Sequence, residues 1–488
     1  MYNTGTTLKG QKINNNKIQY TRRTIMKEKK KSNKQKGMKI SRRSFMGSAA
    51  AVAAFTIVPR HVLGGPGQIP PSDKLNIASV GAGGMAASNI NACATENIVA
   101  LAEVDSERGA QTFEKFPNAK RYTDYREMLE KQKDIEAVII STPDHMHAPP
   151  AMMAMKMGKH IYVQKPLTHT VYEARILAET ARKEKVATQM GNQGHSGDGV
   201  HIIDRIIRDG AIGPVREVVA WTNRPIWPQG IYRPRETTRA PRTMNWDLWL
   251  GPAPYRPYNP VYAPFNWRGW WDFGCGALGD MACHLLDPVY YALKLGYPTS
   301  VEACVPVAFA EGSYLQKNTI DETAPAASIV YYEFPARGNM PPLKLAWYDG
   351  GLRPRMPELE QSQQMPGQRQ RVRIPSVIFK GDKAILMCGE YGDNVQTLPA
   401  EIMEKYKQPQ RGAPRGVHEQ NWIQACKGGE PAVSNFDYSG PFTEIVVLGN
   451  LAIRAGRKLY WDGPNMNVTN EPDANKYVSK VYREGFGL

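Results

Sequence analysis

The sequence predicts an α/β protein with an N-terminal Rossmann-type, doubly wound parallel sheet, followed by an α/β domain whose large, open sheet is mostly antiparallel. A glycine loop separates an apolar run from a helical pattern near residue 80. Apolar runs then alternate with helical patterns as far as residue 190, which indicates βαβ units. From residue 300, strand-like runs follow one another without helices between them. We therefore expect a nucleotide-binding domain at residues 73–194, a second domain at 195–465 and a C-terminal tail at 466–488.

The positive charge is concentrated in a leader. Residues 1–63 hold 15 Lys and Arg and one acidic residue, so 14 of the 16 net positive charges lie there. The other 425 residues carry a net charge of only +2, which leaves no basic excess for binding phosphate backbones. We therefore expect no nucleic-acid partner. Residues 1–37 are rich in Lys, Asn and Gln and are predicted to be disordered.

The leader also carries the features of an export signal. Arg42 and Arg43 precede the apolar stretch Gly47–Val58, which is too short to span a bilayer but suits the core of a signal peptide. The arginine pair resembles a twin-arginine (Tat) signal, so we expect the Tat export machinery as a partner and a periplasmic, soluble protein without a stable membrane span. Met38 is the expected translation start, and residues 64–72 form a linker. A lipid-surface anchor or a disordered tail is the alternative, which would leave the protein cytoplasmic or at a membrane surface.

The glycine loop has the form GxGxxA and follows an apolar run at residues 74–80. Such a loop lies between a strand and a helix and binds a dinucleotide. Gly81 allows the tight turn, Gly83 lets the backbone approach a pyrophosphate, and Ala86 permits close packing of helix on strand. Gly84 and Met85 complete the loop, and the following helix presents its amides to the anion.

A second predicted strand, at residues 98–104, ends in an acid. Glu103 lies 22 residues after Gly81, close to the spacing of about 20 at which an acid binds the adenosine ribose hydroxyls. Asp105 is more plausible as a cap of the next helix, although either acid could serve. An acid at this point favours NAD, while Arg108 keeps NADP open as an alternative.

Further strands at residues 137–140, 161–163 and 186–190 alternate with helices at 145–158 and 173–185. Each of these strands is followed by a polar segment, and ligands bind at the carboxyl ends of such strands. From these segments we expect cofactor contacts by Thr142, Pro143, His145, His147, Gln164, Lys165 and Gln193. His145 and His147 lack a nearby acid-rich set of partners, and the six cysteines contain no CxxC pair, so we expect no metal site and no disulfide framework.

Five motifs occur in order, at Gly81–Ala86, Thr142–His145 with His147, Gly158–Pro166, Gly210–Pro214 and Gly276–His284. Through them the chain resembles the Gfo/Idh/MocA family, the relatives of glucose–fructose oxidoreductase and inositol dehydrogenase, from about Lys74 to Asp462. The resemblance implies a substrate domain whose open sheet often forms an oligomer interface, and hence a homo-oligomer. It also implies catalytic roles for Lys165, Asp280 and His284. The family usually has Glu where this chain has Gln164, which alters the field at Lys165.

The chemistry of these three residues fits such roles. Asp280 and His284 are four residues apart and share one face of a helix. A histidine can accept a hydroxyl proton while hydride leaves the carbon, and a nearby lysine can stabilise the developing alkoxide. The alternative is a helix cap at Asp280, a packed core histidine at 284 and a solvated loop lysine at 165.

The second half contains an unusual aromatic segment. Seven of the ten tryptophans lie at residues 221–271, and nine prolines lie between Pro225 and Pro264. This segment is expected either to stack on a sugar or to pack on a neighbouring subunit. Strands are predicted at 301–309, 328–334, 343–347, 372–380 and 384–387, helices at 418–426 and 441–456, a turn at 347–351, and a weak site candidate at His418.

These observations together predict an exported, NAD(P)-dependent oxidoreductase with a tightly bound cofactor. It would transfer hydride between the nicotinamide and a secondary alcohol of a sugar, cyclitol or glycoside. One alternative is an NAD-dependent enzyme that cleaves glycosides through transient oxidation of the sugar and elimination. The other is a catalytically silent carbohydrate-binding relative.

Overall fold

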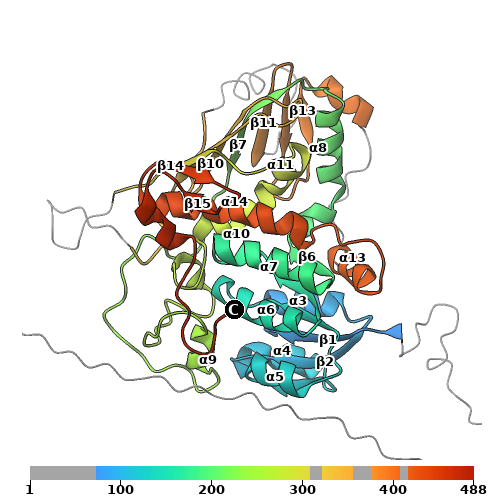
Figure 1. Ribbon diagram of the computed structural model, residues 1–488, viewed down its shortest axis with the longest axis vertical. Helices are drawn as coiled ribbons and strands as arrows, with labels where there is room; N and C mark the ends of the chain where they lie inside the picture. Colours follow the sequence, from blue (N-terminus) through green and yellow to red (C-terminus); the bar gives the residue numbers. More distant parts are fainter. Residues whose placement is uncertain (1–72, 308–320, 356–374, 407–415) are drawn as a thin grey trace, which may run out of the picture. The chain divides into compact units, whose positions relative to one another are not determined.

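The first domain is built on a six-stranded parallel sheet with the strand order β3-β2-β1-β4-β5-β6. The computed structural model describes residues 73–307, 321–355, 375–406 and 416–488, all within one compact unit. The strands are β1 (Asn76–Val80), β2 (Asn97–Ala102), β3 (Lys120–Tyr122), β4 (Ala137–Ile140), β5 (His160–Gln164) and β6 (Thr188–Gly191). This sheet confirms the predicted Rossmann-type architecture (Figure 1).

Both faces of this sheet are buried, which explains why its strands read as continuous apolar runs. Ile77 of β1 packs in a cluster on one face, and Ala78 and Val80 pack in a second cluster on the other. Local signals start the helices: Thr170 and Glu173 form a capping box at α7. The helices of this domain are α3 (Met85–Ala92), α4 (Ser106–Lys115), α5 (Tyr125–Lys131), α6 (Ala148–Lys156) and α7 (Val171–Glu184).

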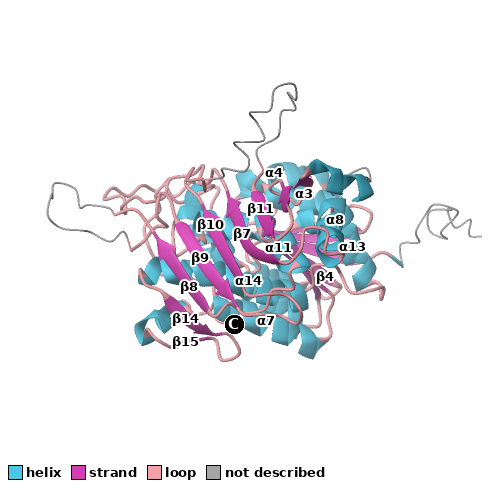
Figure 2. Ribbon diagram, turned by 90° about the horizontal axis from the view of Figure 1, so that it is seen from above, coloured by secondary structure: helices cyan, strands magenta, loops and turns pink. Residues whose placement is uncertain are grey.

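The second domain contains a nine-stranded sheet with the order β13-β12-β11-β7-β10-β9-β8-β14-β15 (Figure 2). Every neighbouring pair is antiparallel except β7 and β10, so the predicted mostly antiparallel sheet is confirmed. The strands are β7 (Val215–Trp221), β8 (Ser300–Cys304), β9 (Ile329–Phe334), β10 (Leu343–Tyr348), β11 (Val377–Gly381), β12 (Ile385–Cys388), β13 (Gln396–Leu398), β14 (Leu459–Asp462) and β15 (Asn467–Val468).

Helices cover one face of this second sheet and connect it to the first domain. The 20-residue α14 is buried along most of its length and packs against α7, α10 and β8 (Figure 1). It begins at Phe436 rather than at the predicted Pro441, because Asn435 caps it by accepting from the Asp437 amide at 2.9 Å. The other helices are α8 (Asp198–Arg208), α9 (Trp246–Leu250), α10 (Gly276–Leu285), α11 (Asp287–Ala292) and α13 (Val417–Cys426). Short 3₁₀ turns lie at 144–146, 193–196, 266–269, 400–406 and 472–477.

The aromatic segment at residues 222–272 packs on the first domain of its own chain. The Asn245 amide donates to the Val104 carbonyl at 2.8 Å, and the Ser106 amide donates to the Thr243 carbonyl at 2.9 Å. The aromatic side chains form their own buried cluster, in which Trp246 and Trp249 are stacked 4.7 Å apart. The segment is therefore a cap on the Rossmann domain, a placement that neither sequence interpretation anticipated.

The predicted C-terminal tail also returns to the first domain. After β15, Lys480 pairs with Glu173 at 2.8 Å, and Arg483 pairs with Asp247 of α9. Phe486 is buried between the guanidinium groups of Arg126 and Arg483, whose carbon atoms lie 4.3 and 5.0 Å from its ring centre. The segment is thus part of the folded body.

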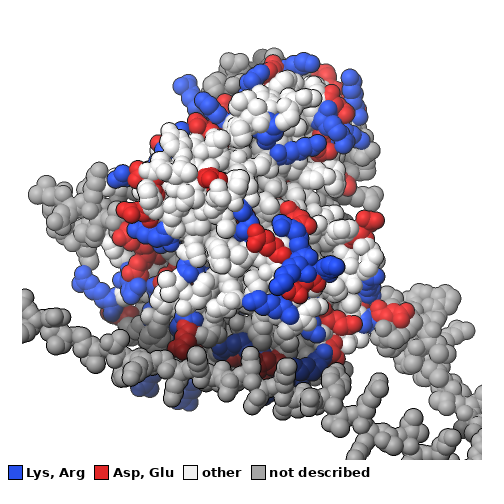
Figure 3. Space-filling view, in the orientation of Figure 1, with Lys and Arg blue, Asp and Glu red and all other residues white. Residues whose placement is uncertain are grey.

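The remaining expectations concern the leader and the surface. The signal and linker at residues 1–72 lie outside the described residues, as do 308–309 and 372–374 of two predicted strands. Within the described ranges, no helix is long and apolar enough to cross a membrane. On the face shown in Figure 3, basic and acidic side chains are interspersed, in keeping with the small net charge of the body.

Candidate active site

The glycine loop connects β1 to α3 in the conformation that its sequence predicts. Gly81 has φ +90°, and a Cβ there would lie 2.7 Å from the Ser141 carbonyl oxygen. Any larger residue would therefore be strained by both its backbone and its contacts. A Cβ on Gly83 would lie 2.9 Å from the Arg108 carbonyl oxygen, so this glycine lets α4 approach the loop. Ala86, in the first turn of α3, is fully buried, as close packing of helix on strand requires.

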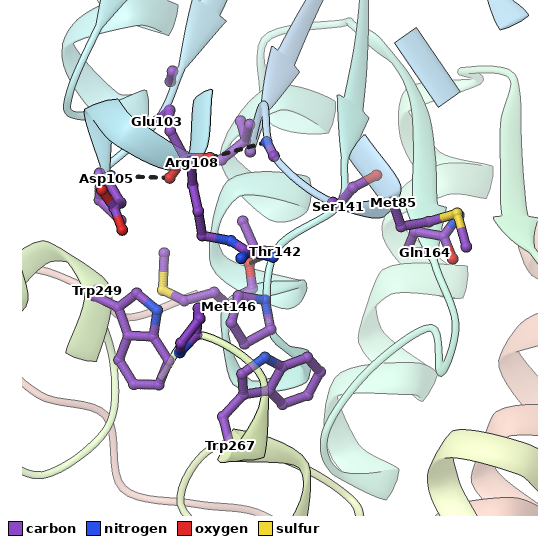
Figure 4. Close-up of a pocket in the computed structure, with 18 of the residues that line it drawn as sticks. Met85, Glu103, Asp105, Arg108, Ser141, Thr142, Met146, Gln164, Trp249 and Trp267 are labelled. Carbon is purple, nitrogen blue, oxygen red and sulfur yellow. Dashed lines mark hydrogen bonds between the residues drawn. The ribbon is translucent and has the colours of Figure 1, made fainter. Parts of the chain in front are cut away.

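Glu103, directly after β2, stabilises this loop by hydrogen bonds. Its carboxylate accepts from the amides of Ala82 at 2.9 Å and Gly83 at 3.3 Å, and also from the Asp105 amide at 3.0 Å (Figure 4). Burial raises the pKa of Glu103, although these three amides oppose the shift. Asp105 caps α4 by accepting from the Glu107 amide at 3.2 Å, as the sequence suggests. Both acids border the cavity described next.

A cavity of about 370 Å³ runs from the glycine loop to the start of α10. Residues from both ends of the chain line it, among them Gly81, Gly83, Gly84, Met85, Thr142, Pro143, Gln164, Lys165 and Asp280. The aromatic segment contributes Trp249 and Trp267, which lie across the cavity from Glu103 (Figure 4). Phe486 completes the wall beside Tyr125. The cavity therefore joins the predicted cofactor loop to two of the three predicted catalytic residues.

Lys165 and Asp280 form a partly buried ion pair on the wall of this cavity. The Lys165 ammonium donates to Asp280 Oδ1 at 2.8 Å and to the Asp280 carbonyl at 2.7 Å. Arg268 donates to the same Oδ1 at 3.2 Å. Burial alone would raise the pKa of Asp280, but the two cations outweigh it and lower this pKa to about 2. The pair thus holds an ammonium group at the cavity, as a role at a substrate oxygen requires.

Asp144 is a titratable group in this cavity that the sequence analysis did not select. Its Oδ2 accepts from the Cys275 amide at 3.0 Å, just before α10. Burial raises the pKa of Asp144 to about 7, against the lowering effect of Lys165 and Arg268. Asp144 lies within the strand-end motif at residues 142–145; its acidic side chain beside two histidines was the available signal.

His284 lies one turn after Asp280 on α10 but does not border the cavity. Its Nδ1 is buried without a hydrogen-bond partner among the described residues, and its ring lies 4.8 Å from that of Tyr391. Burial, followed by the charge of Lys165, lowers the pKa of His284 to about 3. The imidazole is therefore neutral.

His145 and His147 do not border the cavity, and their predicted contact with the cofactor stays a prediction. The ring nitrogens of His145 face the carbonyls of Phe273 at 3.2 Å and Trp249 at 3.1 Å. Those of His147 face the carbonyls of Pro166 at 2.7 Å and Thr142 at 2.9 Å. Both side chains are buried outside the cavity, where they hold the strand-end loops in place.

Gln193 and His418 also lie away from the cavity lining. Gln193 Nε2 donates to the Tyr162 hydroxyl of β5 at 3.1 Å, and the predicted contact of Gln193 with the cofactor stays a prediction. His418 faces the Ser196 hydroxyl at 2.6 Å and the Met190 carbonyl at 2.7 Å. Its two ring nitrogens are thus already engaged.

Other lining residues had weaker signals in the sequence. Arg268 lies in the aromatic segment, and Phe486 lies about 200 residues after α10. Their place at the site follows from tertiary packing, which no local pattern reports. Within the described ranges, no group of three or more His, Cys, Asp or Glu could hold a metal ion, and the six cysteines are free.

Comparisons with known proteins identify both domains. Residues 75–192 match a family model described as an oxidoreductase family NAD-binding Rossmann fold. Residues 200–311 match a second one, described as the C-terminal alpha/beta domain of the oxidoreductase family.

Curated relatives match over part of their length. A levoglucosan dehydrogenase of Pseudarthrobacter phenanthrenivorans is 26% identical over 192 residues, which are 39% of this chain and 41% of that protein. A glycosyl hydrolase family 109 protein of Shewanella pealeana is 28% identical over 204 residues, covering 36% of this chain and 44% of that protein. The chain thus spans less than half the length of either relative.

Solved structures share the fold. The WlbA dehydrogenase of Chromobacterium violaceum, in complex with NADH and UDP-GlcNAcA, has a TM-score of 0.57 at 16% identity, covering 80% of this chain and 96% of that one. A levoglucosan dehydrogenase in complex with NADH and levoglucosan has a TM-score of 0.53 at 18% identity, covering 79% of this chain and 99% of that one. At these identities, the likeness extends to the fold alone.

Proposed function

We propose a function for a chain that carries both domains of the Gfo/Idh/MocA oxidoreductase family, its NAD-binding Rossmann domain and its C-terminal α/β domain. The protein transfers hydride between a retained NAD and a secondary alcohol of a sugar, cyclitol or glycoside. The observation that carries this proposal is the Lys165–Asp280 pair on the wall of the cavity that begins at the glycine loop. The named activities of the relatives, a levoglucosan dehydrogenase among them, support a sugar as the substrate.

The residues present fit a dinucleotide. Gly81, Gly83 and Gly84 border the cavity, and the first amides of α3 have no acceptor within the helix, which suits a pyrophosphate. Glu103 and Asp105 place acidic oxygens at the end of β2 for the adenosine ribose, and their negative charge disfavours a 2′-phosphate. Bound there, the nicotinamide would supply hydride acceptance and donation.

Each of the catalytic side chains has a separate role at the alcohol. Lys165 donates to the substrate oxygen and stabilises its negative charge as the carbon is oxidised. Asp280 and Arg268 fix the position of the Lys165 ammonium. His284 is assigned the role of proton acceptor for the hydroxyl from its place one turn after Asp280 on α10; in the structure without substrate its imidazole is neutral.

Retention of the nucleotide is the first point to test. The purified protein is denatured and the released small molecules are identified by mass; NAD or NADH is expected. Lys165→Ala and His284→Ala are then assayed with a panel of sugars and glycosides for keto products. Unchanged activity in both variants would contradict the proposed mechanism.

Glycoside cleavage is the second candidate, favoured by the matches to glycosyl hydrolase family 109 proteins. In that reaction the sugar is oxidised, the aglycone is eliminated and the product is reduced, so no net oxidation occurs. A chromogenic glycoside separates the two functions. Aglycone released without accumulation of NADH or keto sugar supports cleavage, whereas keto sugar formed in proportion to NADH supports the dehydrogenase.

We also propose that the protein is exported by the Tat route and forms a homo-oligomer. The Arg42-Arg43 pair before an apolar stretch supports export. Replacing both arginines with lysine should retain the protein in the cytoplasm, which fractionation would detect. The oligomeric state can be measured by sedimentation on the exported protein.

A further inference from the structure

A buried polar network lies behind Gln164, which lines the cavity at the end of β5. Gln164 Nε2 donates to Asn89 Oδ1 at 3.0 Å. Asn89, on α3, in turn donates from Nδ2 to Glu419 Oε1 on α13 at 2.7 Å. The side chains of Gln164, Asn89 and Glu419 are 6%, 1% and 4% exposed. The carboxylate of Glu419, in the second domain, is thus linked to the wall of the cavity by hydrogen bonds through the side-chain amides of Asn89 and Gln164.

The direction of every hydrogen bond in this network is set at Glu419. Gln193 Nε2 donates to the Tyr162 hydroxyl oxygen at 3.1 Å, so the Tyr162 proton points to Glu419 Oε1 at 3.2 Å. Burial raises the pKa of Tyr162 well above its ordinary value, so this proton stays in place. Glu419 Oε1 therefore accepts two hydrogen bonds, and Asn89 must present its NH₂ group to it.

The orientation of Asn89 then determines that of Gln164. Asn89 Oδ1 faces away from Glu419 and accepts from both Gln164 Nε2 and the Ser141 hydroxyl, the latter at 3.1 Å. Gln164 must therefore turn its own NH₂ group toward Asn89. Its other amide atom, Oε1, has no hydrogen-bond partner among the described residues, and the side chain lies on the cavity wall, on the opposite side of the view from Asp105 (Figure 4).

A glutamate at position 164 is incompatible with this arrangement. Its carboxylate would meet Asn89 Oδ1 at about the 3.0 Å now spanned by a hydrogen bond. Asn89 could not rotate to help, because its Oδ1 would then face the Glu419 carboxylate. Two buried acceptors without a proton between them are unfavourable.

We propose that Glu419 and Asn89 are positioning residues that hold Gln164 Oε1 toward the cavity as a neutral hydrogen-bond acceptor for a hydroxyl or amide N–H donor of the bound nicotinamide nucleotide. This inference rests on the proposed function, because it needs the nucleotide in the cavity. It assigns to α13 a role in cofactor recognition, although α13 follows the Rossmann domain by more than 200 residues.

The proposal is tested with variants that exchange hydrogen-bond donors and acceptors at positions 164 and 419. NADH affinity is measured by fluorescence titration for the full-length protein, freed of nucleotide, and for Gln164→Glu, Glu419→Gln and the double variant. Gln164→Glu should weaken NADH binding about tenfold, since it places two acceptors against each other. Glu419→Gln alone should change the affinity by less than about threefold, because Gln can still accept from Asn89.

The double variant is the decisive measurement. Gln at 419 can donate to Asn89 Oδ1 and to the Tyr162 hydroxyl, whose proton then turns to Gln193 once that amide presents its Oε1. Asn89 can then rotate and donate to Glu at 164, so binding should return to within about threefold of the wild type. Gln164→Met removes Oε1 without adding charge. It should also weaken binding about tenfold, and Glu419→Gln should not rescue it. This variant keeps the test available if Gln164→Glu fails to fold.

Gln420→Glu is the matched control. Gln420 follows Glu419 on the same helix, donates to the Ala92 carbonyl at 2.7 Å and does not line the cavity. Its replacement should leave NADH affinity within about twofold, whatever it does to the unfolding temperature. If the double variant binds no better than Gln164→Glu, or if Gln164→Met binds as the wild type does, the inference is wrong while the proposed function stands. A wild-type protein that does not bind NADH would instead refute the proposed function.

Discussion

Asp144 should make the stability of this protein fall as the pH rises. Its side chain is 4% exposed, and burial is the main cause that raises its pKa from 3.8 to about 7. Because the folded state then binds the proton more tightly than the unfolded state, this contribution to stability is fully present below pH 3.8 and is lost as the pH rises to about 7. At about 1.4 kcal/mol per pH unit, the total is about 4 kcal/mol, of which about 2.5 kcal/mol is lost between about pH 5 and pH 8.

Asp144→Asn removes the titration and keeps an oxygen that can accept from the Cys275 amide. The free energy of unfolding is measured by urea titration with tryptophan fluorescence at pH 5 and pH 8. At each pH, the free energy of unfolding of the wild type is subtracted from that of the variant. This difference should be about 2.5 kcal/mol larger at pH 8 than at pH 5. Asp473→Asn makes the same change at an exposed carboxyl and should show a difference below about 0.5 kcal/mol. A difference below about 0.5 kcal/mol for Asp144→Asn itself would refute the reasoning.

Three further outcomes are expected. Lys165→Ala should lower kcat by at least about 100-fold while the dissociation constant of NADH changes only a few-fold, because the ammonium acts on the alkoxide; steady-state kinetics and titration separate the two. Phe486→Ala should weaken NADH binding about fivefold, because it opens the cavity wall. Val481→Ala, at a side chain 91% exposed, should not change the affinity. Equal affinities of the two variants for NADH would contradict a role of Phe486 in the cavity wall. Gly81→Ala should lower the free energy of unfolding, measured with urea, by about 3 kcal/mol. The reason is that the φ of +90° and the 2.7 Å approach to the Ser141 carbonyl oxygen leave no room for a Cβ. A decrease below about 1 kcal/mol would show that the loop relaxes.

The Rossmann sheet could be predicted because its strands are buried on both faces and its loop needs glycine. Ala137–Ile140, for example, coincides with β4. By contrast, β3 has the sequence Lys-Arg-Tyr, with only Tyr122 buried, and carries no apolar run. Helix α14 was predicted to begin at Pro441, but the cap at Asn435 starts it at Phe436, and Pro441 lies inside the helix.

The candidate site was predictable where function requires a residue type in a motif. Lys165 and Asp280 belong to such motifs, and the structure places them in contact. The motif around His145 and His147 was equally visible, but the partners of these rings include carbonyls at Phe273, about 130 residues away. Sequence reports the presence of an imidazole and not the direction in which its nitrogens point.

For polar side chains at strand ends, too, the sequence does not show which partner they contact. Gln193 follows β6 as a ligand-binding residue would, yet its amide is used by Tyr162. The aromatic segment could be recognised by composition, but its contact with Val104 is a backbone hydrogen bond that no side-chain pattern encodes. Long-range pairing therefore decides which of several equivalent polar residues face the cavity.

The walls of the cavity have consequences for the order of events during protein synthesis. Gly81 and Phe486 lie 405 residues apart in the chain, yet they border the same space. Ribosomes add roughly 5–20 residues per second, and N-terminal domains fold first. A nascent chain therefore exposes its completed Rossmann sheet for roughly 15–60 s before Phe486 is made. During this interval the nucleotide groove is open along one side, so a dinucleotide can enter sideways rather than thread through a finished wall.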